Sequence, residues 1–342
     1  MTSPIDQAWP AEGLERVEAC PYCGSNRRSL AYKDVQDWSF NCAPGKWDYW
    51  DCLNCQSLYL NPRPTRSSIG LAYAKYYTHN DTDNLPVLIA IKERLRNECI
   101  SLKLNANIQP RLHLPKLLNA AVSRIGNRVV MPFGWTELAN LNKGRFIDVG
   151  CGAGLTVSVA HQLGWDAMGL EIDPAAVREA RRDGLNIIEG TYEELNRYEN
   201  RFNYVMCSHV LEHVHEPRDL LAKLRSAIMP GGVLFITLPN SLSAVRRHFG
   251  ANWRGLEAPR HLSIPSESYL RELLSELGFS IQSLADDSPA TAGESQRIQR
   301  RGARISRQDL VMARQMGIRP QSQLGENDFI KLVCKVPMGV SK

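Results

Sequence analysis

The chain has 342 residues, of which 43% are hydrophobic and 23% are charged. This composition excludes a largely disordered protein and indicates one large globular domain with appendages, or two modest domains. No apolar run approaches the roughly 18 residues that a membrane-spanning helix requires. The first residues also lack the basic start and apolar stretch of a signal peptide. We therefore expect a cytoplasmic protein without a transmembrane segment.

Residues 1–64 are rich in turn formers and contain two cysteine pairs, Cys20-Pro-Tyr-Cys23 and Cys52-Leu-Asn-Cys55, separated by 28 residues. Two such pairs supply four thiolates for a tetrahedral Zn²⁺ ion and leave no position for water. We predict a zinc-ribbon-like module whose structural zinc is held by Cys20, Cys23, Cys52 and Cys55. The alternative is a metal-free pair of turns. Cys42 is expected to be a bystander.

Residues 65–143 are predicted to form a helical linker or lid. Residues 65–79 look helical, and 85–142 contain helical stretches interrupted by Pro110, Pro115 and Pro132. Residues 85–145 hold ten basic and three acidic side chains. This basic segment could face an anionic substrate or a membrane surface, or it could form a solvated helical surface.

From residue 144 onward, predicted strands and helices alternate. Apolar runs predict strands over residues 145–149, 166–170, 186–189, 202–207, 233–237, 279–284 and 329–334. Helices are expected up to residue 163 and over residues 174–182, 216–228 and 266–277. This alternation predicts an α/β fold with a doubly wound parallel sheet across residues 144–342. Residues 286–325, which hold seven arginines, are expected to form a polar excursion before the last strand.

A glycine loop, Asp148-Val-Gly-Cys-Gly-Ala-Gly154, lies between the first of these strands and the helix that follows. Glycines allow tight turns and a close approach of backbone to ligand, and a helix N-terminus offers free N–H groups to an anion. Glu171 ends the next strand, where an acidic side chain can accept hydrogen bonds from ribose hydroxyls. The loop therefore predicts a nucleotide-like cofactor.

With Asp148 before it, this G-x-G-x-G loop resembles motif I of the class I S-adenosylmethionine-dependent methyltransferases. The segments 202–213 and 229–234 resemble the fourth strand and the Pro-Gly-Gly turn of that superfamily. Pro259-Arg-His-Leu262 with Gly278-Phe279 resembles a sugar- and small-molecule-methylating branch that carries N-terminal zinc-binding segments. The resemblance implies a Rossmann-like sheet and S-adenosylmethionine as the cofactor.

The resemblance also implies which residues bind the cofactor. These are Asp148, Gly150, Cys151, Gly152, Gly154, Glu171, Ile172, Thr191, Tyr192, Cys207, Ser208 and Tyr77. The sequence departs from the family at Gly190-Thr-Tyr-Glu193, because the Asp that usually lies near the adenine amine is absent. Thr191 and Tyr192 would have to serve there.

Methyl transfer to a hydroxyl is helped by a general base, and histidine has a suitable pKa. We expect His261 to be this base, with His209 as the second candidate. Arg260 is expected to hold a phosphate or carboxylate of the acceptor, and Trp253 to supply a flat apolar wall. A structural role for His261 and a packing role for Trp253 are the alternatives.

A second metal site is a further possibility. If residues 209–213 were helical, His209, Glu212 and His213 would share one face. This set partly resembles the Glu-x-x-Glu-His metal site of ubiquinone-type O-methyltransferases, with His209 replacing the first Glu. A divalent cation there could polarise an acceptor hydroxyl. Otherwise Glu212 and His213 are structural.

The sequence therefore predicts methyl transfer to a small molecule, such as a sugar, a nucleotide sugar or another secondary metabolite. Oxygen is the expected acceptor atom, and carbon is possible. The alternative is an RNA methyltransferase whose zinc module binds nucleic acid. The neutral charge of residues 1–79 and the absence of an Asn-Pro-Pro-Tyr signature disfavour it. A non-catalytic binding protein is a third hypothesis, and the glycine loop argues against it.

Overall fold

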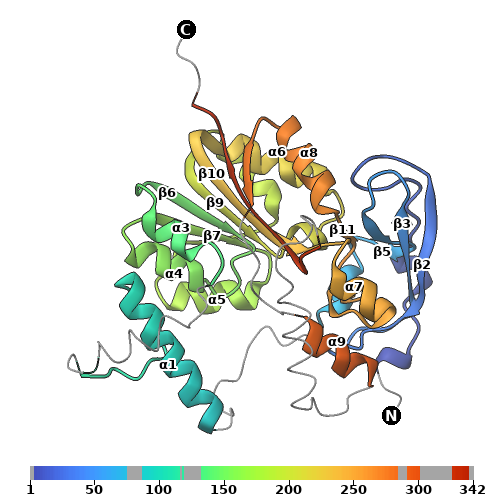
Figure 1. Ribbon diagram of the computed structural model, residues 1–342, viewed down its shortest axis with the longest axis horizontal. Helices are drawn as coiled ribbons and strands as arrows, with labels where there is room; N and C mark the ends of the chain where they lie inside the picture. The colour runs from blue at the N-terminus through green and yellow to red at the C-terminus, as the bar shows by residue number, and fades with distance from the viewer. Residues whose placement is uncertain are drawn as a thin grey trace. The chain divides into compact units, whose positions relative to one another are not determined.

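The computed structural model describes residues 4–74, 87–115, 118, 132–283, 291–300 and 326–338. Figure 1 shows the helices and strands of the chain. The chain divides into two compact units. The first unit comprises Met1–Tyr76, Cys207–Arg225 and Ile236–Pro337, and the second comprises Tyr77–Met206, Ser226–Phe235 and Met338–Lys342. The expected arginine-rich excursion, 286–325, falls mostly outside the described residues, which include 291–300.

A seven-stranded sheet has the order β12-β13-β10-β9-β6-β7-β8. Its strands are β6 (Arg145–Val149), β7 (Asp166–Glu171), β8 (Ile187–Glu189), β9 (Phe202–Ser208), β10 (Ile228–Pro239), β12 (Ser280–Ser283) and β13 (Phe329–Lys335). β6, β7 and β8 pair in parallel, whereas β12 and β13 pair antiparallel. This is a mostly parallel sheet with an antiparallel edge, and it confirms the predicted α/β methyltransferase fold.

Helices alternate with these strands, as the sequence predicts. The longer helices are α1 (Val87–Leu104), α3 (Trp135–Asn140), α4 (Leu155–Gln162), α5 (Pro174–Arg182), α6 (Pro217–Ala227), α7 (Ala244–Phe249), α8 (Glu267–Glu276) and α9 (Ala292–Gln299). α5 begins at Pro174 because Asp173 caps it by accepting a 2.8 Å hydrogen bond from the Ala175 amide. None of the described helices is both long enough and apolar enough to cross a membrane.

In the second unit, aromatic side chains fill the core beside the sheet. The ring centroids of Phe146, Trp165 and Tyr204 lie 5.6 to 6.2 Å apart. Ile100 of α1 packs in a smaller cluster with Trp135 of α3 and other apolar side chains. Both helices lie within residues 65–143, for which the sequence predicts a helical linker or lid.

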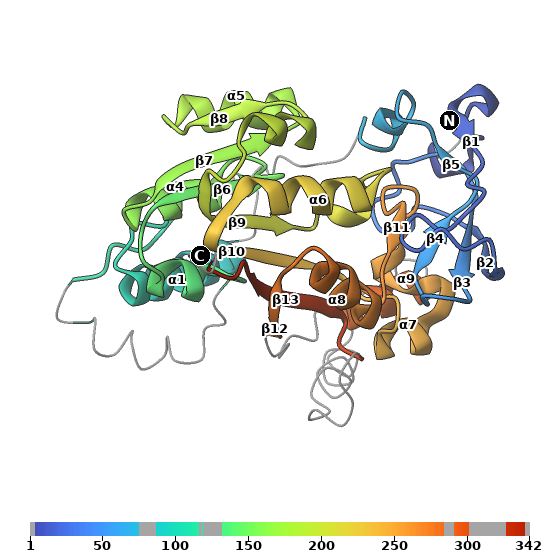
Figure 2. The ribbon, with the colours of Figure 1, turned by 90° about the horizontal axis from the view of Figure 1, so that it is seen from above.

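The first unit contains a second sheet of order β11-β4-β3-β2. β2 (Arg28–Val35), β3 (Trp47–Cys52) and β4 (Leu58–Leu60) come from the N-terminal segment, whereas β11 (Ser263–Ile264) comes from far along the chain. β11 lies beside β4 in antiparallel register, with Ser263 opposite Tyr59 (Figure 2). The N-terminal segment thus shares a sheet with residues from the predicted methyltransferase segment, a pairing that no local sequence pattern predicts.

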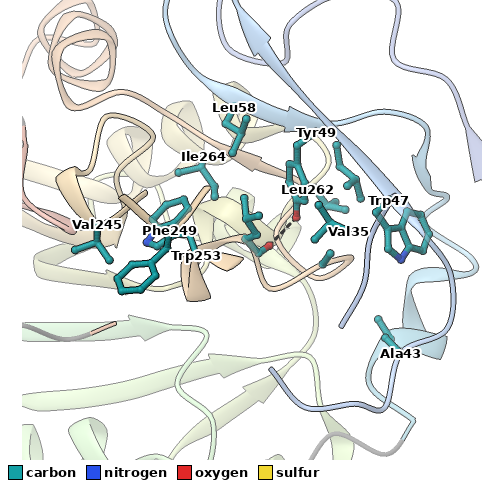
Figure 3. Close-up of a cluster of buried hydrophobic side chains, with 14 of the residues drawn as sticks. Val35, Ala43, Trp47, Tyr49, Leu58, Val245, Phe249, Trp253, Leu262 and Ile264 are labelled. Atoms are coloured by element: carbon teal, nitrogen blue, oxygen red, sulfur yellow. Dashed lines mark hydrogen bonds between the residues drawn. The ribbon is translucent and has the colours of Figure 1, made fainter. Parts of the chain in front are cut away.

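A shared hydrophobic core accompanies that sheet (Figure 3). Trp47, Tyr49 and Leu58 of the N-terminal segment pack with Phe249 and Trp253, among other side chains. The smaller pieces of the first unit are β1 (Leu14–Glu15), β5 (Arg63–Pro64) and a 3-10 helix at Ile69–Ala72. The sequence predicts a helix over residues 65–79. Of this range the structure describes residues 65–74, which contain the short 3-10 helix.

Candidate active site

The glycine loop follows β6 in the second unit. Gly150, Gly152 and Gly154 have φ angles of 74°, 54° and 82°. Residues other than glycine rarely adopt such positive φ angles. A Cβ atom on Gly154 would lie 2.6 Å from Leu185 Cδ1 and 3.3 Å from Ala180 Cβ, so a side chain at this position would require its neighbours to shift. A Cβ atom on Gly152 would meet no atom of the described residues within 4 Å. Gly152 therefore presents bare backbone to open space, as a cofactor site requires.

Glu171, at the end of β7, places its carboxylate on this loop. Its Oε2 atom accepts a 2.7 Å hydrogen bond from the Gly152 amide, and its Oε1 atom accepts the amides of Ile172 and Asp173, each at 2.8 Å. The Ile172 side chain is 65% exposed. A carboxylate beside an exposed apolar side chain fits a ligand with ribose hydroxyls and a flat base.

Asp148 is buried at the end of β6. Burial, together with the negative charge of Glu171, raises the pKa of its carboxyl to about 8. Burial likewise raises the pKa of the neighbouring Cys151 thiol. Asp148 therefore carries a proton for much of the time at neutral pH when no ligand is bound.

The other predicted cofactor residues are placed as follows. Thr191 follows β8 and is exposed, and its hydroxyl oxygen accepts a 3.3 Å hydrogen bond from the Glu193 amide. Tyr192 is buried, with an exposed fraction of 9%. Cys207 is buried and Ser208 is half-buried at the end of β9, within the first unit. Tyr77 lies outside the described residues.

In the first unit, Glu212, His213 and His261 come together. Each of the three residues offers one atom that could bind a metal, and these three atoms all lie within 4.8 Å of one another. Glu212 and His213 belong to a 3-10 helix, Leu211–His213, and the rings of His213 and His261 meet edge to face with centroids 4.7 Å apart. Glu212 is fully buried, and its Oε2 atom has no hydrogen-bond partner in the described part of the chain.

Hydrogen bonds fix the orientation of the two histidine rings. His261 is 5% exposed, and its Nδ1 atom lies 2.7 Å from the carbonyl oxygen of Gly255. The Nδ1 atom of His213 lies 3.0 Å from the carbonyl oxygen of Arg260 and 3.1 Å from the hydroxyl of Tyr73. Because a carbonyl only accepts, each Nδ1 atom carries a proton. The Nε2 atom of each ring is then the one able to take a proton or bind a metal.

Burial also sets the charge of His261. Desolvation lowers the pKa of its imidazole to about 4, although Glu257 opposes this shift with its Oε2 atom 3.6 Å from His261 Nε2. His261 is therefore neutral at neutral pH. His209 differs, since its side chain is 40% exposed. Its Nδ1 atom lies 3.1 Å from Glu212 Oε1.

The structure corrects the two acceptor contacts expected from the sequence. Arg260 is fully buried, and its three guanidinium nitrogens donate to Asp37, Glu257 and the carbonyl of Ala72. It therefore has no nitrogen to offer an acceptor anion. Trp253 is 2% exposed, and its indole nitrogen donates to Asp328 at 3.0 Å. It packs in the core and cannot form a wall for the acceptor.

The expected second metal set also changes. His209 has a φ of 55° and stands before the 3-10 helix, so it does not share a helical face with Glu212 and His213. His261 takes its place in the cluster. Sequence spacing gave no sign of this, because His261 lies on another segment. Asp37, Glu257 and Tyr73, which also contact this region, were missed for the same reason.

The four paired cysteines do come together. The Sγ atoms of Cys20 and Cys55 lie 3.6 Å apart, and those of Cys23 and Cys52 lie 3.5 Å apart. Around a tetrahedral zinc with Zn–S bonds of about 2.3 Å, sulfur atoms are separated by about 3.8 Å. The cluster is thus compatible with zinc.

Comparison with known proteins decides the family. Residues 114–284, half of the chain, match the family model of a methyltransferase domain. The chain belongs to this methyltransferase family. The glycine loop and the α/β fold agree with this assignment.

Curated relatives of this methyltransferase include two ubiquinone biosynthesis O-methyltransferases. The protein from Alkalilimnicola ehrlichii is 33% identical over 109 residues, 30% of this chain and 44% of the relative. The protein from Bordetella avium is 32% identical over 147 residues, 38% of this chain and 61% of the relative. The chain thus spans about half the length of these relatives. Among solved structures, an S-adenosylmethionine-dependent methyltransferase from Archaeoglobus fulgidus is 18% identical, covers 57% of this chain and 86% of its own, and has a TM-score of 0.41.

Proposed function

We propose that this methyltransferase transfers the methyl group of S-adenosylmethionine to a hydroxyl oxygen of a small molecule. The observation that carries the proposal is the cluster of Glu212, His213 and His261, whose ligating atoms lie within 4.8 Å of one another. Transfer from a sulfonium mainly needs alignment of the acceptor, and a hydroxyl acceptor also needs to lose its proton. Two relatives are named ubiquinone biosynthesis O-methyltransferases, which supports oxygen as the acceptor atom.

In this proposal the glycine loop and Glu171 hold the cofactor. The backbone of Gly150, Gly152 and Gly154 lies against the methionine end. The Glu171 carboxylate accepts hydrogen bonds from the ribose hydroxyls. Ile172 packs on the adenine, and Thr191 and Tyr192 reach its edge. The open space at Gly152 supports this assignment.

The His213–His261 pair receives the acceptor's proton. His261 is neutral at neutral pH because burial lowers its pKa to about 4, and its ring stands edge to face with that of the less buried His213. His209, the more exposed histidine, is the second candidate for the base.

A divalent cation at the same cluster is the second candidate mechanism. One carboxylate and two imidazoles form a donor set that suits first-row divalent metals. The buried Glu212 Oε2 atom, which has no hydrogen-bond partner among the described residues, favours a bound cation. Glu212, His213 and His261 would hold the ion, and it would polarise the acceptor hydroxyl. A zinc ion at Cys20, Cys23, Cys52 and Cys55 would be structural, because four thiolates complete its coordination.

Transfer of labelled methyl groups to a panel of acceptors tests the proposal. The panel contains catechols and other phenols, nucleotide sugars and total RNA. We expect label in a small hydroxyl compound. Label in RNA alone, together with an electrophoretic shift that weakens at higher salt, would contradict it. Activity that survives chelation favours the histidine pair. Activity that is lost and then restored by one added cation favours the metal.

A further inference from the structure

A buried ion pair joins the N-terminal segment to the loop that carries His261. The Arg260 Nη2 atom lies 2.5 Å from Asp37 Oδ1, and both side chains are fully shielded from solvent. Asp37 also accepts the backbone amides of Phe40, Cys42 and Ala43 at 3.0 to 3.2 Å. These amides of the N-terminal segment hold the Asp37 carboxylate in place independently of Arg260.

A second set of contacts holds the backbone of the same loop. The Tyr49 hydroxyl lies 2.6 Å from the Leu256 carbonyl oxygen and 2.9 Å from that of His261. The Leu60 amide donates to the Leu262 carbonyl at 2.9 Å. Tyr49 lies in the core that the N-terminal strands share with this loop (Figure 3).

These contacts act on both histidines. The Arg260 carbonyl lies 3.0 Å from His213 Nδ1, and the next residue along the chain is His261. Arg260 also binds Glu257, whose backbone has a φ of 39° and whose carboxylate lies 3.6 Å from His261 Nε2. A buried ion pair adds little net stability because its desolvation is costly, but removing one partner leaves a buried charge uncompensated. The pair is therefore better suited to fixing a geometry than to stabilising the fold.

We propose that Asp37 is a positioning residue for methyl transfer, which acts through Arg260 to hold His261 against His213. The N-terminal cysteine segment then serves as the scaffold of the histidine loop. This inference rests on the proposed function, in which the two histidines receive the acceptor's proton. It goes beyond that function because it assigns the alignment of the histidines to a residue more than 200 positions earlier in the chain.

The test compares Asp37→Asn with the wild type in the protein of residues 1–342, purified in the presence of zinc. Two-bond ¹H–¹⁵N correlation spectra of histidine-labelled protein report the tautomers of His213 and His261, assigned with His213→Gln and His261→Gln. We expect Asp37→Asn to lose the fixed Nδ1–H signatures of these two rings while those of the other histidines persist. Turnover on the acceptor found by the screen should fall about 10- to 100-fold, with cofactor affinity within about twofold of wild type. Asp37→Glu should restore part of both.

Asp51→Asn is the matched control, because Asp51 also pairs an N-terminal strand with an arginine, Arg246, at 2.8 Å. It should leave both histidine signatures unchanged. If Asp37→Asn does not fold, Tyr49→Phe removes the hydroxyl contacts to the loop without burying a charge. Unchanged tautomers in the variant that folds would overturn the inference. The spectra need no acceptor, so failure of the proposed O-methylation would be seen separately in the turnover assay.

Discussion

The carboxylate of Glu171 accepts the amide hydrogen of Gly152 at 2.7 Å, although 19 positions separate the two residues. Two strands of the sheet thus bring an acidic side chain to a loop that faces open space. We predict that Gly152→Arg abolishes S-adenosylmethionine binding, because the added side chain would fill that space. Equilibrium dialysis with labelled cofactor measures this.

Gly184→Arg controls for backbone strain in that experiment. Gly184 has a φ of 79° and open space at its Cβ position, as Gly152 does, and it also belongs to the second unit. It should retain cofactor binding. Equal loss in both variants would mean that strain, and not occupation of the site, explains the effect.

Substitution of the paired histidines should slow turnover without weakening cofactor binding. We expect His213→Gln and His261→Ala each to lower kcat by about 10²- to 10⁴-fold, the range found for general bases. The exposed His248, in the same unit, provides the control His248→Ala. Wild-type turnover in both variants would move the role of base to His209.

Asp148 should make the stability of the cofactor-free protein depend on pH. Its folded pKa of about 8 exceeds the ordinary value of 3.8, so the folded state retains a proton that the unfolded state releases. The free energy of unfolding therefore falls as pH rises between these values, by at most about 1.4 kcal/mol per pH unit. We predict that Asp148→Asn removes this decline.

Denaturant unfolding at pH 5 and pH 8 measures that effect. Asp148→Asn should be stabilised relative to the wild type at pH 8 more than at pH 5. Asp166→Asn is the control, because the Asp166 side chain is 69% exposed. An equal stabilisation by Asp148→Asn at both pH values would show that Asp148 does not retain the proton.

Removal of the zinc that we expect at the four paired cysteines should destabilise the first unit. We expect one zinc per chain in the wild type and none in Cys55→Ser, because three thiolates bind the ion more weakly and leave a position open. Metal analysis and thermal unfolding check this, with lower-temperature unfolding expected in the variant. Cys99→Ser, outside the cluster, should keep its zinc. Full metal content in Cys55→Ser would contradict the assignment.

Local sequence pattern predicted the sheet well. β6 spans Arg145–Val149, as predicted, and α5 spans Pro174–Arg182, because apolar runs and an N-terminal cap determine such elements locally. β10 was predicted too short, since residues 230–232 were read as a turn, whereas the strand runs from Ile228 to Pro239. The glycine loop and Glu171 were found because their spacing follows directly from a strand, a turn and a helix.

The histidine site was only partly predictable, because its geometry depends on contacts between distant segments. Arg260 looked like a ligand for an anion, but its partner Asp37 lies 223 positions away. Trp253 looked like a wall of the site, but it packs in a core shared with the N-terminal strands. No periodicity reveals that β11 pairs with β4, since nothing local to either segment specifies a partner so far away.

Calorimetric titration of the purified protein with S-adenosylmethionine, with zinc measured in the same preparation, tests the central claim most directly. We predict micromolar binding of one cofactor per chain together with one zinc. Absence of binding in protein that contains zinc would contradict the claim that the loop from Asp148 to Gly154, with Glu171, holds the methyl donor.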